Sequence, residues 1–172
     1  SRSRGPLQRR TRADRPVRVS GPHVVLLGDS IFDNAAYVPG DPPVEAQLRG
    51  ALPEGRVTLL AVDGDVVAGV AGQLRRLPRA ATHLVVSVGG NHALGYIDVL
   101  TERATTVGEA LLRMADIGEE FARRYRAMLD AVLSRSLPAA VCTIYYPAFD
   151  EAGLQRMAVA AETFFNDVIL RC

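Results

Sequence analysis

Three short polar stretches contain the residue types that acyl-transfer chemistry requires. They are GDS at 28–30, DGD at 63–65 and GGNH at 89–92, and each follows an apolar run. A serine hydroxyl can act as a nucleophile, and backbone N–H groups or a carboxamide can stabilise the oxyanion that forms when it attacks a carbonyl carbon. Ser30 is therefore a candidate nucleophile. The N–H groups of Ser30 and Gly64 and the carboxamide of Asn91 are candidate donors of an oxyanion hole.

The elements that must position these residues alternate between two hydrophobic periods. Continuous apolar, β-branched runs predict strands at 23–28, 56–62, 82–88 and 139–146. Helical periodicity predicts helices at 42–52, 66–77, 111–132 and 151–171. This alternation predicts an α/β fold, a doubly wound, flavodoxin-like three-layer sandwich around a parallel sheet. Such sheets place their chemistry at the carboxyl ends of the strands, where all three polar stretches are expected.

The three stretches resemble, in order, the motifs of the SGNH hydrolases, also called GDSL esterases and lipases. GDSIFDN resembles the first motif, with Ser30 as nucleophile and N–H donor. VDGDVVAG resembles the second, with Gly64 as backbone donor, although the spacing also permits Gly69. VSVGGNHAL resembles the third, with Asn91 as side-chain donor, and His92 stands where the family usually has Asp. The resemblance covers residues 22–172. It implies a cofactor-independent hydrolase that cleaves a small-molecule ester or thioester through an acyl-serine intermediate.

The family's fourth motif, Asp-x-x-His, has no counterpart in the sequence. The only histidines are His23, His83 and His92, and none has Asp three residues before it. We expect the sequence to end before the fifth strand of such a domain, which leaves four strands and no visible general base. An exposed edge on the fourth strand would favour self-association. The alternative function is a non-catalytic binding or interaction domain on the same fold. A flavodoxin-like mononucleotide binder is a further alternative, although GDSIFDN lacks the glycines of a phosphate cradle.

Each candidate residue also has a structural interpretation. Ser30 could cap a helix together with Asp33, while Gly64 and Asn91 could be turn formers. Asp29 could support the site, and His92 could act as the base or hold its loop in place. Asp29, Asp33, Asp63 and Asp65 lie on separate turns without a ligand-rich loop, and we predict no metal site from them. The segment 93–108 is expected to form a pocket wall.

The composition separates a basic arm from an acidic body. The first twenty residues hold seven of the 20 basic residues and one of the 19 acidic residues. We expect residues 1–21 to be a disordered arm and 22–172 to be one domain. Because the body has a net negative charge, it has no broad basic surface, and we expect no nucleic-acid partner. No apolar run is long enough to span a membrane, and no signal peptide is visible, so we expect a cytoplasmic location.

Overall fold

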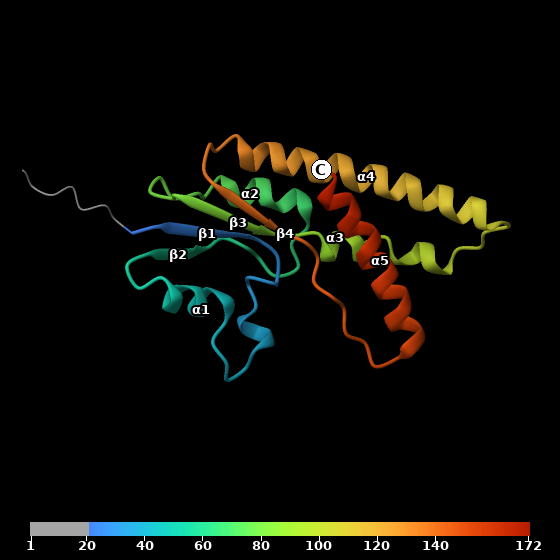
Figure 1. The fold of residues 1–172 in the computed structure, drawn as a ribbon, viewed down its shortest axis with the longest axis horizontal. Helices are drawn as coiled ribbons and strands as arrows, with labels where there is room; N and C mark the ends of the chain where they lie inside the picture. Colours follow the sequence, from blue (N-terminus) through green and yellow to red (C-terminus); the bar gives the residue numbers. More distant parts are fainter. Residues whose placement is uncertain (1–20) are drawn as a thin grey trace, which may run out of the picture.

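Four parallel strands form one sheet between two layers of helices in a computed structural model that describes residues 21–172 (Figure 1). The strands are β1 (His23–Gly28), β2 (Arg56–Leu59), β3 (His83–Ser87) and β4 (Ala139–Cys142), in the spatial order β2-β1-β3-β4. All three pairings are parallel. The predicted doubly wound α/β fold is confirmed. Of the basic arm predicted at residues 1–21, residues 1–20 lie outside the described residues.

The helices cover the two faces of the sheet unequally. They are α1 (Val44–Ala51), α2 (Val70–Leu74), α3 (Gly90–Leu94), α4 (Val107–Leu133) and α5 (Ala152–Leu170), with 3-10 turns η1 (Ala35–Tyr37), η2 (Val67–Gly69) and η3 (Ile97–Thr101). Figure 1 shows α1 on one face and α2 and α4 on the other, and α5 packs against α4. The expected helix 66–77 is divided between η2 and α2, so it is shorter and less regular than its apolar pattern indicates.

The core alternates between the two faces along each strand. Val25 and Leu27 of β1 are fully buried in the larger cluster, which includes Phe121 of α4 and Phe165 of α5. Leu26, which lies between them, faces the smaller cluster under α1. Successive strand residues point to opposite faces, so a continuous apolar run is required wherever helices cover both.

Two strands end earlier than the sequence predicts. β2 stops at Leu59 because the N–H groups of Leu60 and Ala61 both donate to Leu26 O, which breaks the regular ladder. β4 stops at Cys142, and Ile144 leaves the sheet. Its N–H and C=O are bound by the side-chain amide of Asn166 on α5, at 2.7 and 2.9 Å. The chain after β4 therefore turns toward α5 instead of extending the sheet.

The outer edge of β4 is open in the described part of the chain. Within residues 21–172, β4 pairs only with β3, and Ala139, Ala140 and Val141 are exposed. Self-association through this edge stays a prediction. Across the same residues, no helix combines the length and apolar character needed to cross a membrane.

Candidate active site

Ser30 lies in a tight turn immediately after β1. The Asp29 N–H donates to Ser87 O on β3 at 3.0 Å, and Asp29 O accepts the N–H groups of Phe32 and Asp33, both at 3.1 Å. Gly28 has φ +127°, and a Cβ built there would lie 1.8 Å from Ser87 O. Only glycine fits this close approach, so the sequence Gly-Asp-Ser holds the serine at a fixed place relative to β3.

The helix-capping interpretation of Ser30 is wrong. No α-helix begins at this turn, and the next regular element is η1, which starts at Ala35. Asp33, the proposed second half of the capping pair, instead accepts the Asp63 N–H at 3.0 Å and so joins the β1 and β2 loops. The Ser30 hydroxyl makes no hydrogen bond to any other described residue, and the side chain is half-buried.

Asn91 approaches the site from the beginning of α3. Gly89 has φ +139°, and this sharp turn at the end of β3 lets the helix begin at Gly90. Asn91 Nδ2 donates one of its two N–H groups to Asp65 O at 3.1 Å. No acceptor among residues 21–172 binds the second N–H, so within this part of the chain it can donate to a ligand, as an oxyanion-hole carboxamide requires.

Gly64 and Gly69 differ in whether their N–H groups are available. The Gly69 N–H donates to Val66 O at 2.8 Å, and a Cβ at Gly69 would overlap the Asp65 carboxylate. Gly64 lies in an exposed turn with φ +77°, and no acceptor among residues 21–172 binds its N–H. Gly64 does not line the cavity described below, but it directly precedes Asp65, which holds Asn91. Of the two glycines, Gly64 has the available donor.

A buried glutamine connects the three loops, and it is not among the residues predicted from the sequence. Gln73 of α2 is 2% exposed. Its Oε1 accepts the Gly28 N–H at 2.8 Å, and its Nε2 donates to Gly28 O and to Asp65 Oδ2, both at 2.7 Å. Through Asp65, this amide links the Ser30 turn to the loop that holds Asn91.

Ser30 and Asn91 both line a cavity of about 220 Å³ at the carboxyl end of the sheet. The other walls are mainly apolar and come from the segment after α3, from α4, from the chain after β4 and from α5. Representative lining side chains are Ile97, Leu100, Met114, Ile117, Phe149 and Met157. The segment expected to form a pocket wall contributes Ala93 to Leu100. Several of these side chains are about half exposed, among them Ile97 at 52% and Met157 at 49%, so the cavity opens through an apolar rim.

Solved structures with the same arrangement of strands and helices identify the fold. An extracellular lipase from Streptomyces rimosus has a TM-score of 0.55 and 21% identity, covering 88% of this chain and 75% of the lipase. A phospholipase A1 from Streptomyces albidoflavus has a TM-score of 0.56 and 23% identity, covering 88% and 75%. AlinE4, an esterase of the SGNH-hydrolase family, has a TM-score of 0.56 and 17% identity, covering 86% and 68%.

The chain has the fold of the SGNH hydrolases. At these identities the comparison establishes the SGNH fold, whereas the chemistry depends on the residues of the site. No protein-family model matches the sequence, and the search of curated proteins finds no match.

His92 is not part of the cavity wall in this SGNH fold. Its Nε2 lies 3.3 Å from the Tyr96 hydroxyl and 3.9 Å from Glu120 Oε2, and its ring packs edge-on against Phe121. Burial lowers the pKa of His92, and the nearby Glu120 carboxylate opposes that change. His92 does not line the cavity that Ser30 and Asn91 share. Its contacts connect α3 to α4.

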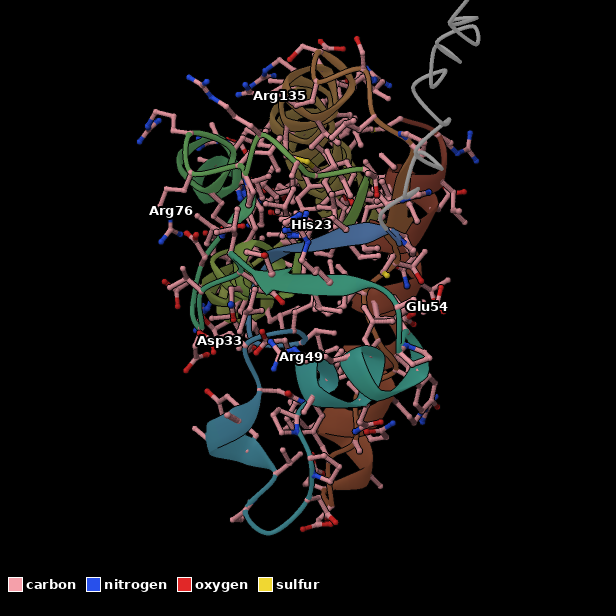
Figure 2. The ribbon with its side chains drawn as sticks, turned by 90° about the vertical axis from the view of Figure 1, so that its left-hand side faces the viewer. His23, Asp33, Arg49, Glu54, Arg76 and Arg135 are labelled. Carbon is pink, nitrogen blue, oxygen red and sulfur yellow. The ribbon has the colours of Figure 1, made fainter. Side chains whose placement is uncertain are left out.

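His23 and His83 lie at the other end of the SGNH sheet. Figure 2 views the molecule from the side on which β1 begins, with His23 near the centre. His23 is 6% exposed, and its Nε2 is 2.8 Å from Thr58 Oγ1 on the neighbouring strand. His83 begins β3 at this same end. Both are therefore remote from Ser30.

The aspartates near the candidate site are engaged in hydrogen bonds within and between loops. Asp29 is 4% exposed, and its Oδ1 accepts the Ile31 N–H. The two oxygens of Asp63 both accept the Tyr37 hydroxyl, and Asp65 binds Gln73. Within residues 21–172, no group of three His, Cys, Asp or Glu side chains is placed to hold a metal ion. These carboxylates stabilise the loop conformations through their hydrogen bonds.

The Asp29→Asn variant is expected to remove a pH-dependent part of the stability. Burial raises the pKa of Asp29, and the N–H groups of Ile31 and Gly89 oppose this rise. The unfolded chain releases this proton near pH 3.9, at about the ordinary Asp pKa, whereas the folded chain keeps it to higher pH. The contribution of Asp29 to the free energy of unfolding therefore falls as the pH rises from the pKa of the unfolded chain through the higher pKa of the folded chain. Urea denaturation at several pH values should show this fall in the parent protein and a flatter profile in Asp29→Asn.

The exposed Asp41 provides the control for this measurement. Asp41→Asn should keep the pH profile of the parent. An Asp29→Asn profile identical to that of the parent would contradict the expected effect of burial.

Proposed function

We propose that this protein is a serine hydrolase of the SGNH family that cleaves an ester or thioester with an apolar acyl group. The observation that supports this most directly is the shared cavity. Ser30 and the Asn91 carboxamide border one apolar space at the carboxyl end of the sheet. Ser30 has no competing hydrogen bond among the described residues, and the structural neighbours include a lipase, a phospholipase and an esterase.

The proposed reaction is acyl transfer in two halves. Ser30 Oγ attacks the carbonyl carbon as its proton passes to a general base. The negative charge that develops on the carbonyl oxygen is stabilised by the N–H of Ser30 and the second N–H of Asn91, two residues that line the cavity. Gly64 is the proposed third donor, and its exposed turn lies outside the cavity lining. The bond to the leaving alcohol or thiol then breaks as that group takes the proton. Water attacks the acyl-serine in the same way and releases the carboxylic acid.

The walls of the cavity favour an apolar acyl group. Each methylene moved from water into an apolar site contributes up to about 0.8 kcal/mol, which is a factor of about four in binding. The value of kcat/KM should therefore rise with acyl length until the cavity is filled. The cavity does not distinguish an oxygen ester from a thioester, because the leaving group lies on the other side of the carbonyl.

A fluorophosphonate probe with a long alkyl chain is expected to label Ser30. Mass spectrometry of the labelled peptide identifies the modified residue, and p-nitrophenyl acetate, butanoate and hexanoate report turnover. Ser30→Ala should lose both labelling and turnover, since no other hydroxyl occupies the nucleophile's place in the turn after β1. The matched control is Ser134→Ala, which changes an exposed serine at the end of α4. Labelling that persists in Ser30→Ala would overturn the assignment of the nucleophile.

A binding domain without catalysis is the second candidate. It is favoured by one observation, that no histidine among the described residues lines the cavity. A serine without a positioned base is a weak nucleophile, and loss of one triad member leaves only about 10³- to 10⁴-fold acceleration over water. This candidate predicts saturable binding of the hexanoate ester to the parent protein, with neither turnover nor labelling of Ser30.

A further inference from the structure

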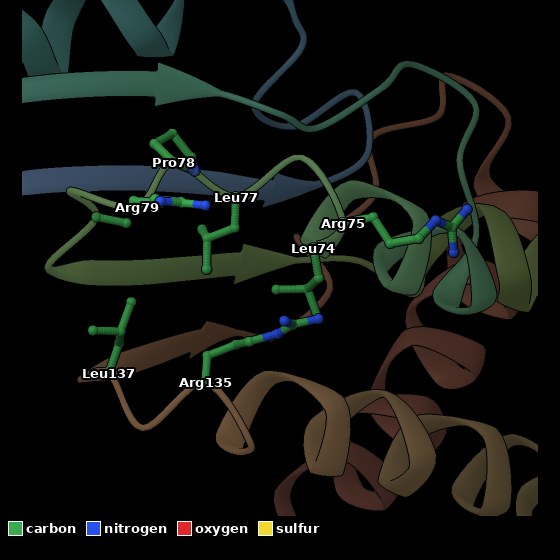
Figure 3. Close-up of a pocket in the computed structure, with 8 residues that line it drawn as sticks. Leu74, Arg75, Leu77, Pro78, Arg79, Arg135 and Leu137 are labelled. Carbon is green, nitrogen blue, oxygen red and sulfur yellow. The ribbon is translucent and has the colours of Figure 1, made fainter.

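A second cavity, of about 580 Å³, lies at the opposite end of the sheet from Ser30 (Figure 3). It is formed by the end of α2, the loop leading into β3 and the loop leading from α4 into β4. Three leucines and three arginines line most of it: Leu74, Leu77, Leu137, Arg75, Arg79 and Arg135. Strands begin and helices end on this side, so nothing in the cavity is part of the proposed active site. Its volume is in the usual range for a small-molecule site.

The three arginines have no carboxylate partners among residues 21–172. Four other arginines, in or just after helices, each pair with an acidic residue one turn earlier: Arg49 with Glu45, Arg113 with Glu109, Arg124 with Glu120 and Arg171 with Asp167. The residues four positions before Arg75, Arg79 and Arg135 are Ala71, Arg75 and Ala131. Arg123, Arg126 and Arg156, on α4 and α5, also have no carboxylate partner among the described residues, but they are spread along the helices. Arg75, Arg79 and Arg135 differ from them because they line one cavity.

The negative ends of the helix dipoles offset only part of the positive charge of these arginines. The carboxyl ends of α2 and α4 both point toward the cavity, and each carries at most about half a negative charge. Together they offset about one of the three arginine charges. Because Arg75 extends away from the cavity, a surplus of about one positive charge from Arg79 and Arg135 remains, in a body whose acidic residues outnumber its basic ones.

The floor of the cavity is apolar and firmly held. Leu74 is 1% exposed in the main core, and Leu77 and Leu137 are half-buried beside it. In Figure 3 the side chains of Leu74 and Leu77 lie between Arg79 and Arg135, while Arg75 extends away. Figure 2 shows Arg135 on the same side as His23, where the strands begin. The two inward arginines can thus hold an anionic group above an apolar surface.

We propose that this cavity binds an organic phosphate monoester. The phosphate contacts Arg79 and Arg135, and the apolar part of the ligand lies on the leucines. A phosphate monoester carries about 1.5 to 2 negative charges at pH 7, opposite in sign to the surplus charge of the cavity. Guanidinium groups bind phosphate oxygens through paired, charge-assisted hydrogen bonds, so two arginines suffice to orient it. This proposal does not depend on esterase activity.

Calorimetric titration with n-hexyl phosphate tests the proposal. The parent protein should bind it saturably, and more tightly than inorganic phosphate, because the hexyl chain covers the leucines. In the double variant Arg79→Ala/Arg135→Ala the affinity should fall by about tenfold or more, since paired charge-assisted hydrogen bonds are lost. Arg49→Ala, which changes an exposed arginine on α1, should bind like the parent. All variants should keep the parent's circular dichroism spectrum, because the replaced side chains are exposed.

Two results would overturn the proposal: no saturable binding of hexyl phosphate, or the same affinity in the double variant as in the parent. Equal affinities for hexyl phosphate and inorganic phosphate would overturn the role of the leucines. Phosphatidylcholine vesicles containing phosphatidic acid distinguish the source of the phosphate. Vesicle binding that the double variant loses assigns the site to a lipid headgroup. Binding of hexyl phosphate without vesicle binding assigns it to a free compound.

Discussion

Gly28→Ala is expected to lower the free energy of unfolding by about 4 kcal/mol. Two costs combine: the strain of a side chain at φ +127°, about 1 to 3 kcal/mol, and the displacement of β3, of similar size. The displacement follows because the new Cβ would lie 1.8 Å from Ser87 O, a backbone atom that cannot rotate away. Equilibrium denaturation in urea measures the loss.

Gly40→Ala separates these two costs. Gly40 also has a positive φ, +93°, but a Cβ there would meet no atom within 4 Å. This variant should therefore lose only about 1 to 2 kcal/mol, the cost of the backbone conformation alone. A Gly28→Ala variant that is no less stable than Gly40→Ala would show that β3 does not constrain the Ser30 turn.

The central strands β1 and β3 were predictable because burial on both faces requires a continuous apolar run. β4 was predicted from a similar run, although Ala139, Ala140 and Val141 are exposed. The run at 23–28 coincides with β1, and the run at 82–88 extends β3 by one residue at each end. The ends of β2 and β4 were not predictable, because tertiary hydrogen bonds determine them. Leu26 O accepts two N–H groups near the end of β2, and Asn166 removes Ile144 from the sheet. Neither contact is visible in a local hydrophobic pattern.

The convergence of Ser30 and Asn91 followed from topology rather than from their spacing. β1 lies between β2 and β3, so the loops after all three strands meet at one edge of the sheet. The exclusion of Ser30 as a cap was not predictable, since Ser-x-x-Asp matches a capping pair and only the structure shows Asp33 bound to the β2 loop. A signal for Gln73 was present. It is the polar member of an apolar i, i+3, i+4, i+7 stripe, with Val70, Leu74 and Leu77.

Gln73→Leu is expected to slow the labelling of Ser30 by about tenfold to a hundredfold, because small displacements of catalytic groups have effects of this size. The variant removes all three side-chain hydrogen bonds of a side chain that is 2% exposed. The Gly28 N–H and the Asp65 carboxylate each lose this partner, which should also lower the free energy of unfolding by about 3 kcal/mol. Labelling reactions quenched at successive times measure the labelling rate, and urea denaturation measures the free energy of unfolding. Gln47→Leu, on the exposed face of α1, should change neither.

Gln73→Glu distinguishes positioning of the site from general destabilisation. At neutral pH the new carboxylate would face Gly28 O and the Asp65 carboxylate, where the amide now donates two hydrogen bonds. Burial and the neighbouring carboxylate should raise the pKa of the introduced group, so it gains a proton as the pH falls. The protonated carboxyl can again donate to one of those oxygens, and the labelling rate relative to the parent should then recover. A rate deficit that stays constant with pH would show that Gln73 only fills space, because loss of packing alone does not depend on the protonation of this side chain.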